Sequence, residues 1–329
     1  MVAVTDPDEE IFCLYTHMNS WSHNAHVDQR SSVFDLGSIS VRQDLSLLST
    51  KGVTGSVVWD ASVVLVELLQ SKQVPAISLS GARILELGSG AGLLGSFLLH
   101  QPIGHLTLTD QSHLLRLLQK NVAMNHPSIV SAESSRLEIV EWAWGEPDGF
   151  RSISALNPPR HTESESIFGL DYIIATDCVY NEFVVPKLVF TLHQACMLSD
   201  RIRDTLGRRS PDSKANLNPA STSAPAPDSS FPPTDRSRTI AIVAQELRSD
   251  LVHQLFVKSI LEIGFRMVRL VHPLLVHDFI DNDDDDDGAD PGEIASNRNQ
   301  AGGASSSPGP PDHPASLTSA ICMYLLWLP

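Results

Sequence analysis

The sequence predicts an α/β domain built on a doubly wound, largely parallel β-sheet. Short apolar runs alternate with segments whose apolar residues recur at helical spacing, and a glycine-rich turn follows the first run. Strands separated by helices join through right-handed crossovers, which makes their sheet parallel. The last two apolar runs, 265–271 and 321–328, have no helical pattern between them. We therefore expect this last pair of strands to be antiparallel.

We expect five apolar runs, each six to nine residues long, as the parallel strands: 82–88, 105–110, 136–144, 171–177 and 239–246. Helical spacing in the intervening segments predicts the helices 92–100, 113–125, 186–198 and 250–264. Before the sheet, residues 33–45 alternate as in a strand or hairpin, and a helix is expected around 63–69.

Composition divides the chain into a core and insertions. Residues 1–53 are expected to form an N-terminal cover with a hairpin, and 54–329 the main domain. Within the latter, 207–238 and 281–316 are rich in proline, serine or aspartate and have almost no apolar periodicity. Such segments bury too little surface to offset the entropy of ordering, so we expect disordered insertions there.

The charge balance restricts the class of partner. Of 329 residues, 42% are hydrophobic, and the net charge is −16. Seven acids lie between 281 and 290, and the remainder of the chain is still acidic. An acidic surface disfavours direct binding of nucleic acid and suits a basic partner.

The cysteines indicate whether a metal site or disulfides are to be expected, and the apolar runs indicate whether the chain enters a membrane. Four cysteines are scattered without a CxxC pair, and histidines do not gather near them at the spacing of metal ligands, so neither a zinc site nor a disulfide framework is expected. The acidic N-terminus lacks a signal-peptide pattern, and no apolar run approaches about 18 residues. We expect no membrane partner and a cytoplasmic location, with a nuclear one as an alternative.

The stretch ELGSGAG at 86–92 is the most informative motif. Glycines at the end of a strand let a ligand approach the backbone, and Asp110 follows Gly90 by 20 residues at the end of the next strand. A carboxylate there can accept hydrogen bonds from both hydroxyls of a ribose. The pattern favours S-adenosyl-L-methionine, whereas GxGxxG at 90–95 keeps a nicotinamide dinucleotide as a rival.

Two further features favour transfer to an amine. Asp177 and Tyr180 follow the fourth parallel strand, where a carboxylate could hold an amine and a phenol could wall its channel. Alternatively, Asp177 caps the next helix and Tyr180 packs in the core. Trp59 and Trp144 could be ordinary core aromatics, but Trp144 is expected to close the third strand, beside an adenine, and an aromatic ring attracts a sulfonium.

Five stretches together resemble the seven-strand lysine methyltransferases of the Asp-x-x-Tyr group: VTGSVVWDAS, ILELGSGAGLLG, LTLTD, WAWGE and DCVYNE. The segments IIATDCVYNEFVVPKLVFTLHQ and IAIVAQELRSDLVHQLFVKSILEIGF are similar to the fungal ribosomal lysine N-methyltransferase 5 branch. The resemblance covers about 52–200 and 238–329. It implies a Rossmann-like sheet and a methyltransferase domain over 54–329.

The resemblance also implies site residues. Those expected to contact S-adenosyl-L-methionine are Trp59, Gly88, Ser89, Gly90, Asp110, Trp144 and Thr176. Asp177 and Tyr180 would face the target lysine, so Asp177→Ala is expected to abolish transfer while leaving cofactor binding largely intact.

The implied reaction is methyl transfer to a lysine of a basic protein, and a large-subunit ribosomal protein is the expected substrate. The enzyme is expected to be a monomer that needs no metal. Other substrates within the same group are a chaperone or an elongation factor. Two further alternatives are an NAD-dependent oxidoreductase, for which no proton donor is evident, and a non-catalytic module that binds a basic partner.

Overall fold

The computed structural model describes residues 1–16, 23–24, 31–49, 54–131, 136–156, 169–207, 231–271, 318–319 and 321–329. The insertion expected at 281–316 lies outside these residues, as does most of the one expected at 207–238. Residues 231–238 are described, and there Arg236 donates to the carbonyls of Ser78 and Ser80 at 2.7 and 2.8 Å. Arg236, in the last residues of the segment 207–238, therefore contacts the folded domain.

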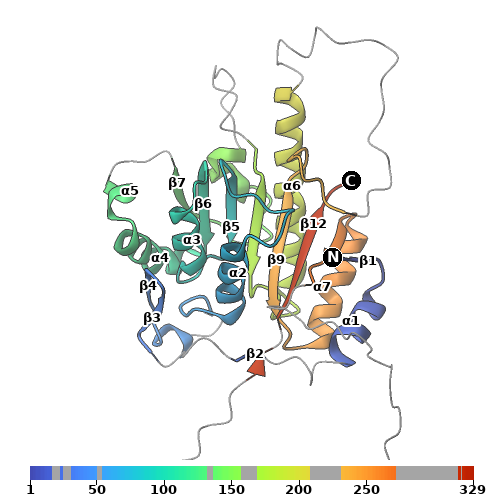
Figure 1. Cartoon of the computed structure of the whole chain (residues 1–329), viewed down its shortest axis with the longest axis horizontal. Coiled ribbons are helices and arrows are strands. Elements are labelled where there is room, and N and C mark those ends of the chain that lie inside the picture. The colour runs from blue at the N-terminus through green and yellow to red at the C-terminus, as the bar shows by residue number, and fades with distance from the viewer. Residues whose placement is uncertain are drawn as a thin grey trace, which may run out of the picture.

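Within the described residues, the main sheet has eight strands in the order β1-β10-β12-β9-β8-β5-β6-β7 (Figure 1). Five neighbouring strands are parallel: β9 (Ile240–Glu246), β8 (Tyr172–Thr176), β5 (Arg83–Leu87), β6 (His105–Asp110) and β7 (Leu137–Glu141). Next to them β12 (Ile321–Trp327) is antiparallel to both β9 and β10 (Arg266–Arg269). The prediction of a Rossmann-like, doubly wound sheet with an antiparallel last pair is confirmed.

The first residues of the chain extend this sheet by one strand. β1 (Val2–Val4) pairs antiparallel with β10, with Val2 opposite Arg269. A run of three residues has no measurable periodicity, so the sequence did not predict this strand. The following helix α1 (Pro7–Thr16) packs on α7 (Asp250–Glu262).

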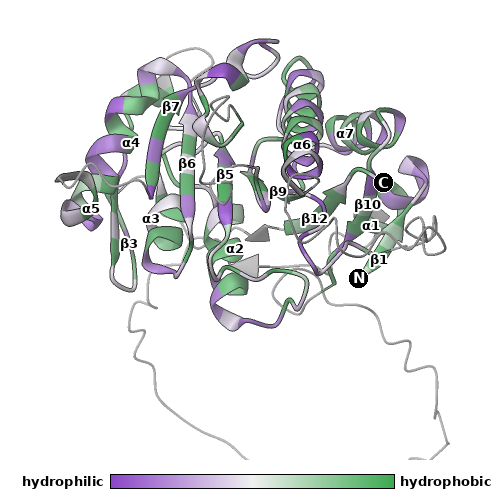
Figure 2. Cartoon of the chain, turned by 90° about the horizontal axis from the view of Figure 1, so that it is seen from above, coloured by the Kyte–Doolittle hydropathy of each residue, from purple (hydrophilic) through white to green (hydrophobic). Residues whose placement is uncertain are grey.

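Helices cover both faces of the sheet, as Figure 2 shows. α2 (Asp60–Ser71) and α3 (Leu93–His100) pack together on one face, and α6 (Val185–Gly207) and α7 pack together on the other. The apolar runs of the strands are buried between these layers; all seven residues of β12 are buried. In the described residues no helix is long and apolar enough to cross a bilayer.

The predicted hairpin forms as β3 (Val33–Leu36) and β4 (Ile39–Arg42), beside α4 (Ser112–Asn125). Asn121 on α4 accepts from the main-chain N–H of Arg42 at 3.0 Å and donates to its carbonyl at 2.9 Å. The same amide donates to the carbonyl of Ala91 at 2.8 Å. One buried asparagine therefore ties the hairpin to the glycine-rich turn. A short helix, α5 (Pro127–Ser131), follows α4.

Candidate active site

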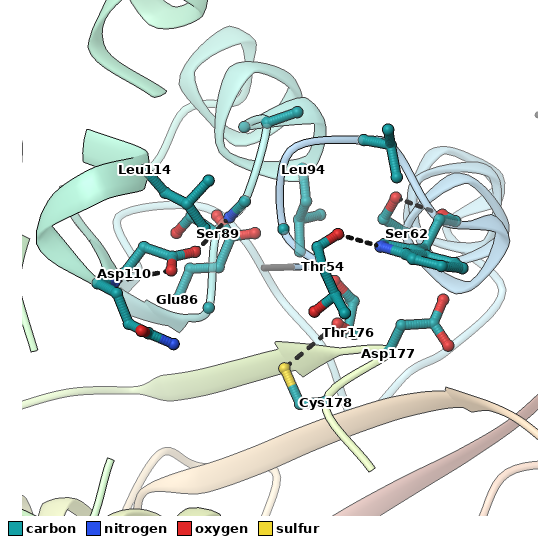
Figure 3. A pocket seen from close by; sticks show the side chains of 18 of the residues that line it. Thr54, Ser62, Glu86, Ser89, Leu94, Asp110, Leu114, Thr176, Asp177 and Cys178 are labelled. Atoms are coloured by element: carbon teal, nitrogen blue, oxygen red, sulfur yellow. Dashed lines mark hydrogen bonds between the residues drawn. The ribbon is translucent and has the colours of Figure 1, made fainter. Parts of the chain in front are cut away.

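A cavity of about 250 Å³ lies at the carboxyl ends of β5, β6 and β8. Open α/β sheets bind ligands at this edge, and a cavity lined by apolar walls with a few polar groups is typical of a small-molecule site. All of the residues predicted from the sequence line it: Trp59, Gly88, Ser89, Gly90, Asp110, Trp144, Thr176, Asp177 and Tyr180. Figure 3 shows part of this lining.

The glycine-rich turn forms the floor of the cavity and requires glycine. Gly88 and Gly90 have φ angles of 68° and 54°, in the left-handed region that favours glycine. A Cβ at Gly90 would lie 2.8 Å from the carbonyl oxygen of Gly55, and one at Gly88 would lie 2.8 Å from the ring of Trp144. The chain around Gly55 therefore lies directly over the turn, so that the loop 54–59 encloses the cavity.

Asp110 at the end of β6 is fixed by the turn. Its carboxylate accepts from the main-chain N–H of Gly90 and of Gln111, each at 2.7 Å. Burial raises the pKa of Asp110, while these two hydrogen bonds favour the ionised form. Each carboxylate oxygen has a second lone pair, so Asp110 can still accept from ribose hydroxyls.

Glu86, which sequence reasoning missed, also lines the cavity. It lies near the end of β5, and its Oε2 is buried without a hydrogen-bond partner, as is Oγ of Ser89. Burial raises the pKa of Glu86 to about 8, although the neighbouring hydroxyl of Ser89 opposes the shift. In Figure 3 the side chains of Glu86, Ser89 and Asp110 gather at one side of the cavity. A buried carboxyl group with an unpaired oxygen is a suitable partner for a cationic group of a ligand.

Three tryptophans line the cavity. Trp59 donates its Nε1–H to the carbonyl of Thr54 at 3.0 Å. β7 ends at Glu141, so the prediction that Trp144 closes this strand is wrong, although Trp144 lines the cavity from the loop beyond. Trp142, which was not predicted, is fully buried beside it. Its position in WAWGE, two residues before Trp144, is the signal that could have identified it.

Asp177 directly follows β8, with its backbone in the left-handed region at φ 52° and its side chain 1% exposed. Its Oδ2 accepts from the main-chain N–H of Ala61 at 3.1 Å, and its Oδ1 accepts from that of Glu246 at 3.1 Å. Asp177 therefore caps α2, which precedes it by more than a hundred residues, rather than the helix that follows it. Burial raises the pKa of Asp177 to about 6, although the nearby Arg248 lowers it.

Tyr180 and Thr176 complete the wall on this side. Tyr180 is half-buried; burial raises the pKa of its phenol, and a hydrogen bond with Thr54 opposes that shift. Thr176 ends β8, and its carbonyl accepts from the buried thiol of Cys178 at 3.3 Å. Within the described part of the chain, no group of histidine, cysteine and carboxylate side chains is placed to hold a metal ion.

The residues present fit S-adenosyl-L-methionine. The unpartnered atoms of Glu86 and Ser89 suit its cationic amino-acid end, Asp110 suits its ribose, and the tryptophans suit its adenine and sulfonium. Gly88 and Gly90 line the cavity with main chain alone, which a ligand can approach closely.

Comparison with known proteins agrees with this fit. Residues 42–220 match the lysine methyltransferase family. The chain is 32% identical over 184 residues to the protein N-lysine methyltransferase METTL21A of Danio rerio, covering 53% of this chain and 72% of the relative. It is 28% identical over 156 residues to the EEF1A lysine methyltransferase 3 of Xenopus tropicalis, covering 46% and 59%.

Among solved structures, an S-adenosylmethionine-dependent methyltransferase from Agrobacterium tumefaciens superposes with a TM-score of 0.42 at 10% identity, covering 91% of this chain and 71% of that one. The family match extends over more than half of the chain. The chain therefore belongs to the lysine methyltransferase family, as a protein-lysine N-methyltransferase whose cofactor is S-adenosyl-L-methionine.

Proposed function

We propose that the protein uses this cavity to transfer a methyl group to a lysine of a basic protein in the translation apparatus. The first candidate substrate is a large-subunit ribosomal protein. The arrangement of carboxyl groups carries the proposal. Glu86 and Asp110 lie at one side of the cavity, and Asp177 lies at the other side, with Thr176 between (Figure 3). A cofactor held by the first two would direct its reactive end toward the third.

The predicted cofactor residues and Glu86 each have a role in this arrangement. Glu86 and Ser89 would hold the amino-acid end, Asp110 the ribose and Trp144 the adenine, while Gly88 and Gly90 offer main chain that the cofactor can approach closely. When bound, S-adenosyl-L-methionine supplies a methyl group on a positively charged sulfur. Trp59 and Thr176 line the reactive end, where an aromatic face stabilises positive charge.

Tyr180 and Asp177 would receive the lysine side chain. The amine must be neutral to attack, and desolvation in a narrow channel favours the neutral form. Alignment of the amine with the methyl group can contribute about 7–11 kcal/mol to catalysis. Both oxygens of Asp177 accept main-chain hydrogen bonds, and Oδ2 keeps a lone pair that can accept from the amine, so we assign Asp177 the role of orienting the amine rather than that of an obligatory general base.

Two observations guide the choice of substrate. Sequence similarity to the ribosomal branch of the family supports a ribosomal protein. A relative named for EEF1A supports an elongation factor as the second candidate. The net charge of −16 suits a basic protein in either case.

The test incubates the purified chain with radiolabelled S-adenosyl-L-methionine and, separately, with large-subunit ribosomal proteins or an elongation-factor fraction. We expect a single labelled ribosomal band, absent with Asp177→Ala. A label in the elongation-factor fraction alone would replace the first candidate by the second. Binding of both fractions without any label would support a non-catalytic module and overturn the proposal.

A further inference from the structure

Arg248 lies in the loop between β9 and α7 and contacts three parts of the site. Its guanidinium stacks over the ring of Trp59, 4.5 Å from the ring centroid. Its Nη2 lies 3.5 Å from Oδ1 of Asp177 and also donates to Glu246. The side chain is 30% exposed, so these contacts are only partly screened by water.

The contacts form a closed ring around the N-terminus of α2. Trp59 immediately precedes α2 and provides no side-chain cap for it. The missing acceptor is supplied by Asp177, through the N–H of Ala61. Arg248 joins the two, since it stacks on Trp59 and faces Asp177. Both of these residues line the cavity, whereas Arg248 does not.

We propose that Arg248 is a positioning residue for methyl transfer, which fixes Trp59 against the cofactor and keeps Asp177 ionised to cap α2. The proposal rests on the proposed function for its effect on turnover, but its effect on cofactor binding stands independently. Arg248 acts through Trp59 and Asp177 and has no contact with the cavity itself.

The charges around Asp177 support this role. Glu246 faces it from the end of β9 and disfavours its ionisation, while the N-terminus of α2 favours it. Asp60 begins that helix, and Cys178 and Tyr180 follow in the same loop. Arg248 is the cation that balances these groups in the described surroundings of Asp177. Without it, the pKa of Asp177 would rise further above 6, and its carboxylate would protonate closer to neutral pH.

The test compares Arg248→Gln and Arg248→Lys with a matched control, Arg151→Gln. Arg151 also lies over a ring, 5.9 Å from the centroid of Phe150, and pairs with an acid, Asp148, at 2.7 Å. It is 70% exposed and does not line the cavity. Thermal melting first establishes that each variant is folded.

Calorimetry then measures the affinity for S-adenosyl-L-methionine against pH, and labelling measures kcat/KM over the same range. Arg248→Gln should weaken binding about tenfold and move the inflection near pH 6, which belongs to Asp177, to higher pH in both profiles. The inflection near pH 8, which belongs to Glu86, should not move. Arg248→Lys keeps the charge and should restore the inflection near pH 6. Profiles of Arg248→Gln that coincide with those of Arg151→Gln would overturn the proposal. If the wild-type chain binds cofactor but labels no protein, the proposed function fails, and the binding profiles still decide the role of Arg248.

Discussion

Two buried carboxyl groups on opposite sides of the cavity differ in their partners. Asp177 has its oxygens satisfied by main-chain N–H groups, whereas Glu86 has one oxygen with no partner. A buried acid without a partner is costly unless a ligand completes it. The main chain therefore holds Asp177 in place, whereas the unpartnered oxygen of Glu86 could pair with a cationic group of the ligand.

This difference predicts a pH dependence of cofactor binding. Because the pKa of Glu86 is raised to about 8, the group is mostly protonated at neutral pH, and a bound cation would favour its ionised form. Binding should therefore release a proton, and affinity should rise with pH up to about 8 and level off above it. Calorimetry in two buffers that differ in their heat of ionisation measures the number of protons released on binding. Glu86→Gln should abolish the release; a variant that retains it would assign the proton to another group.

Asp177 predicts a structural cost as well as a catalytic one. In Asp177→Ala the N–H groups of Ala61 and Glu246 lose their acceptor, which should lower the free energy of unfolding by about 1–3 kcal/mol. Because Asp177 also holds the N-terminus of α2, we expect cofactor affinity to fall as well, which revises the expectation from the sequence that cofactor binding stays largely intact. Asp177→Asn keeps one acceptor oxygen and should unfold at a temperature between those of the wild type and Asp177→Ala. Equal melting of all three proteins would exclude a capping role.

The residues of the site could be predicted from the sequence only where a motif marks them. Gly90 and Asp110 follow from the turn and the spacing between strands, and both line the cavity. Glu86 was missed because a single acid within an apolar run does not reveal whether it is paired. The capping of α2 by Asp177 was missed because this contact joins residues far apart in the sequence, which no local pattern encodes.

At the scale of elements, the close approach of loop 54–59 to the glycine-rich turn encloses the cavity. Gly90→Ala would place a Cβ 2.8 Å from the carbonyl oxygen of Gly55 at φ 54°. The strain should cost about 1–3 kcal/mol of stability, and displacement of the loop should weaken cofactor binding. Gly37→Ala is the control, since Gly37 has φ 61° but no atom within 4 Å of the added Cβ. Equal effects of the two variants on cofactor affinity would show that the close approach is unimportant.

The parallel strands were predicted within one or two residues at most ends, because buried apolar runs bounded by glycine or polar residues are a strong local signal. The exception is β7, which ends three residues before the predicted boundary. Helix α6 continues to Gly207, nine residues beyond its predicted end. The prediction stopped too early because the last turns of this helix are polar and lack an apolar stripe. Pairing of β1 depends on a distant strand and had no local signal.

At the scale of the whole molecule, the edge of the sheet that carries the cavity also exposes an apolar side chain. Phe183 is 76% exposed, three residues after Tyr180. Phe183→Ala should raise KM for the protein substrate several-fold, because the substrate would lose an apolar contact. The affinity for cofactor should stay unchanged, because Phe183 does not line the cavity. Phe12→Ala, at a residue that is 67% exposed on α1, serves as the control. An unchanged KM in Phe183→Ala would show that Phe183 does not contact the protein substrate.

The fold, the cavity and the family together assign methyl transfer to lysine, and the chemical identity of the product tests this most directly. Protein labelled by the wild-type chain with radioactive S-adenosyl-L-methionine is hydrolysed in acid, and its amino acids are separated. We expect the label in Nε-methylated lysine, with none in material treated with Asp177→Ala. Label in methylated histidine or arginine, or label released as methanol from a carboxyl ester, would contradict the assignment of Asp177 and Tyr180 to a lysine channel.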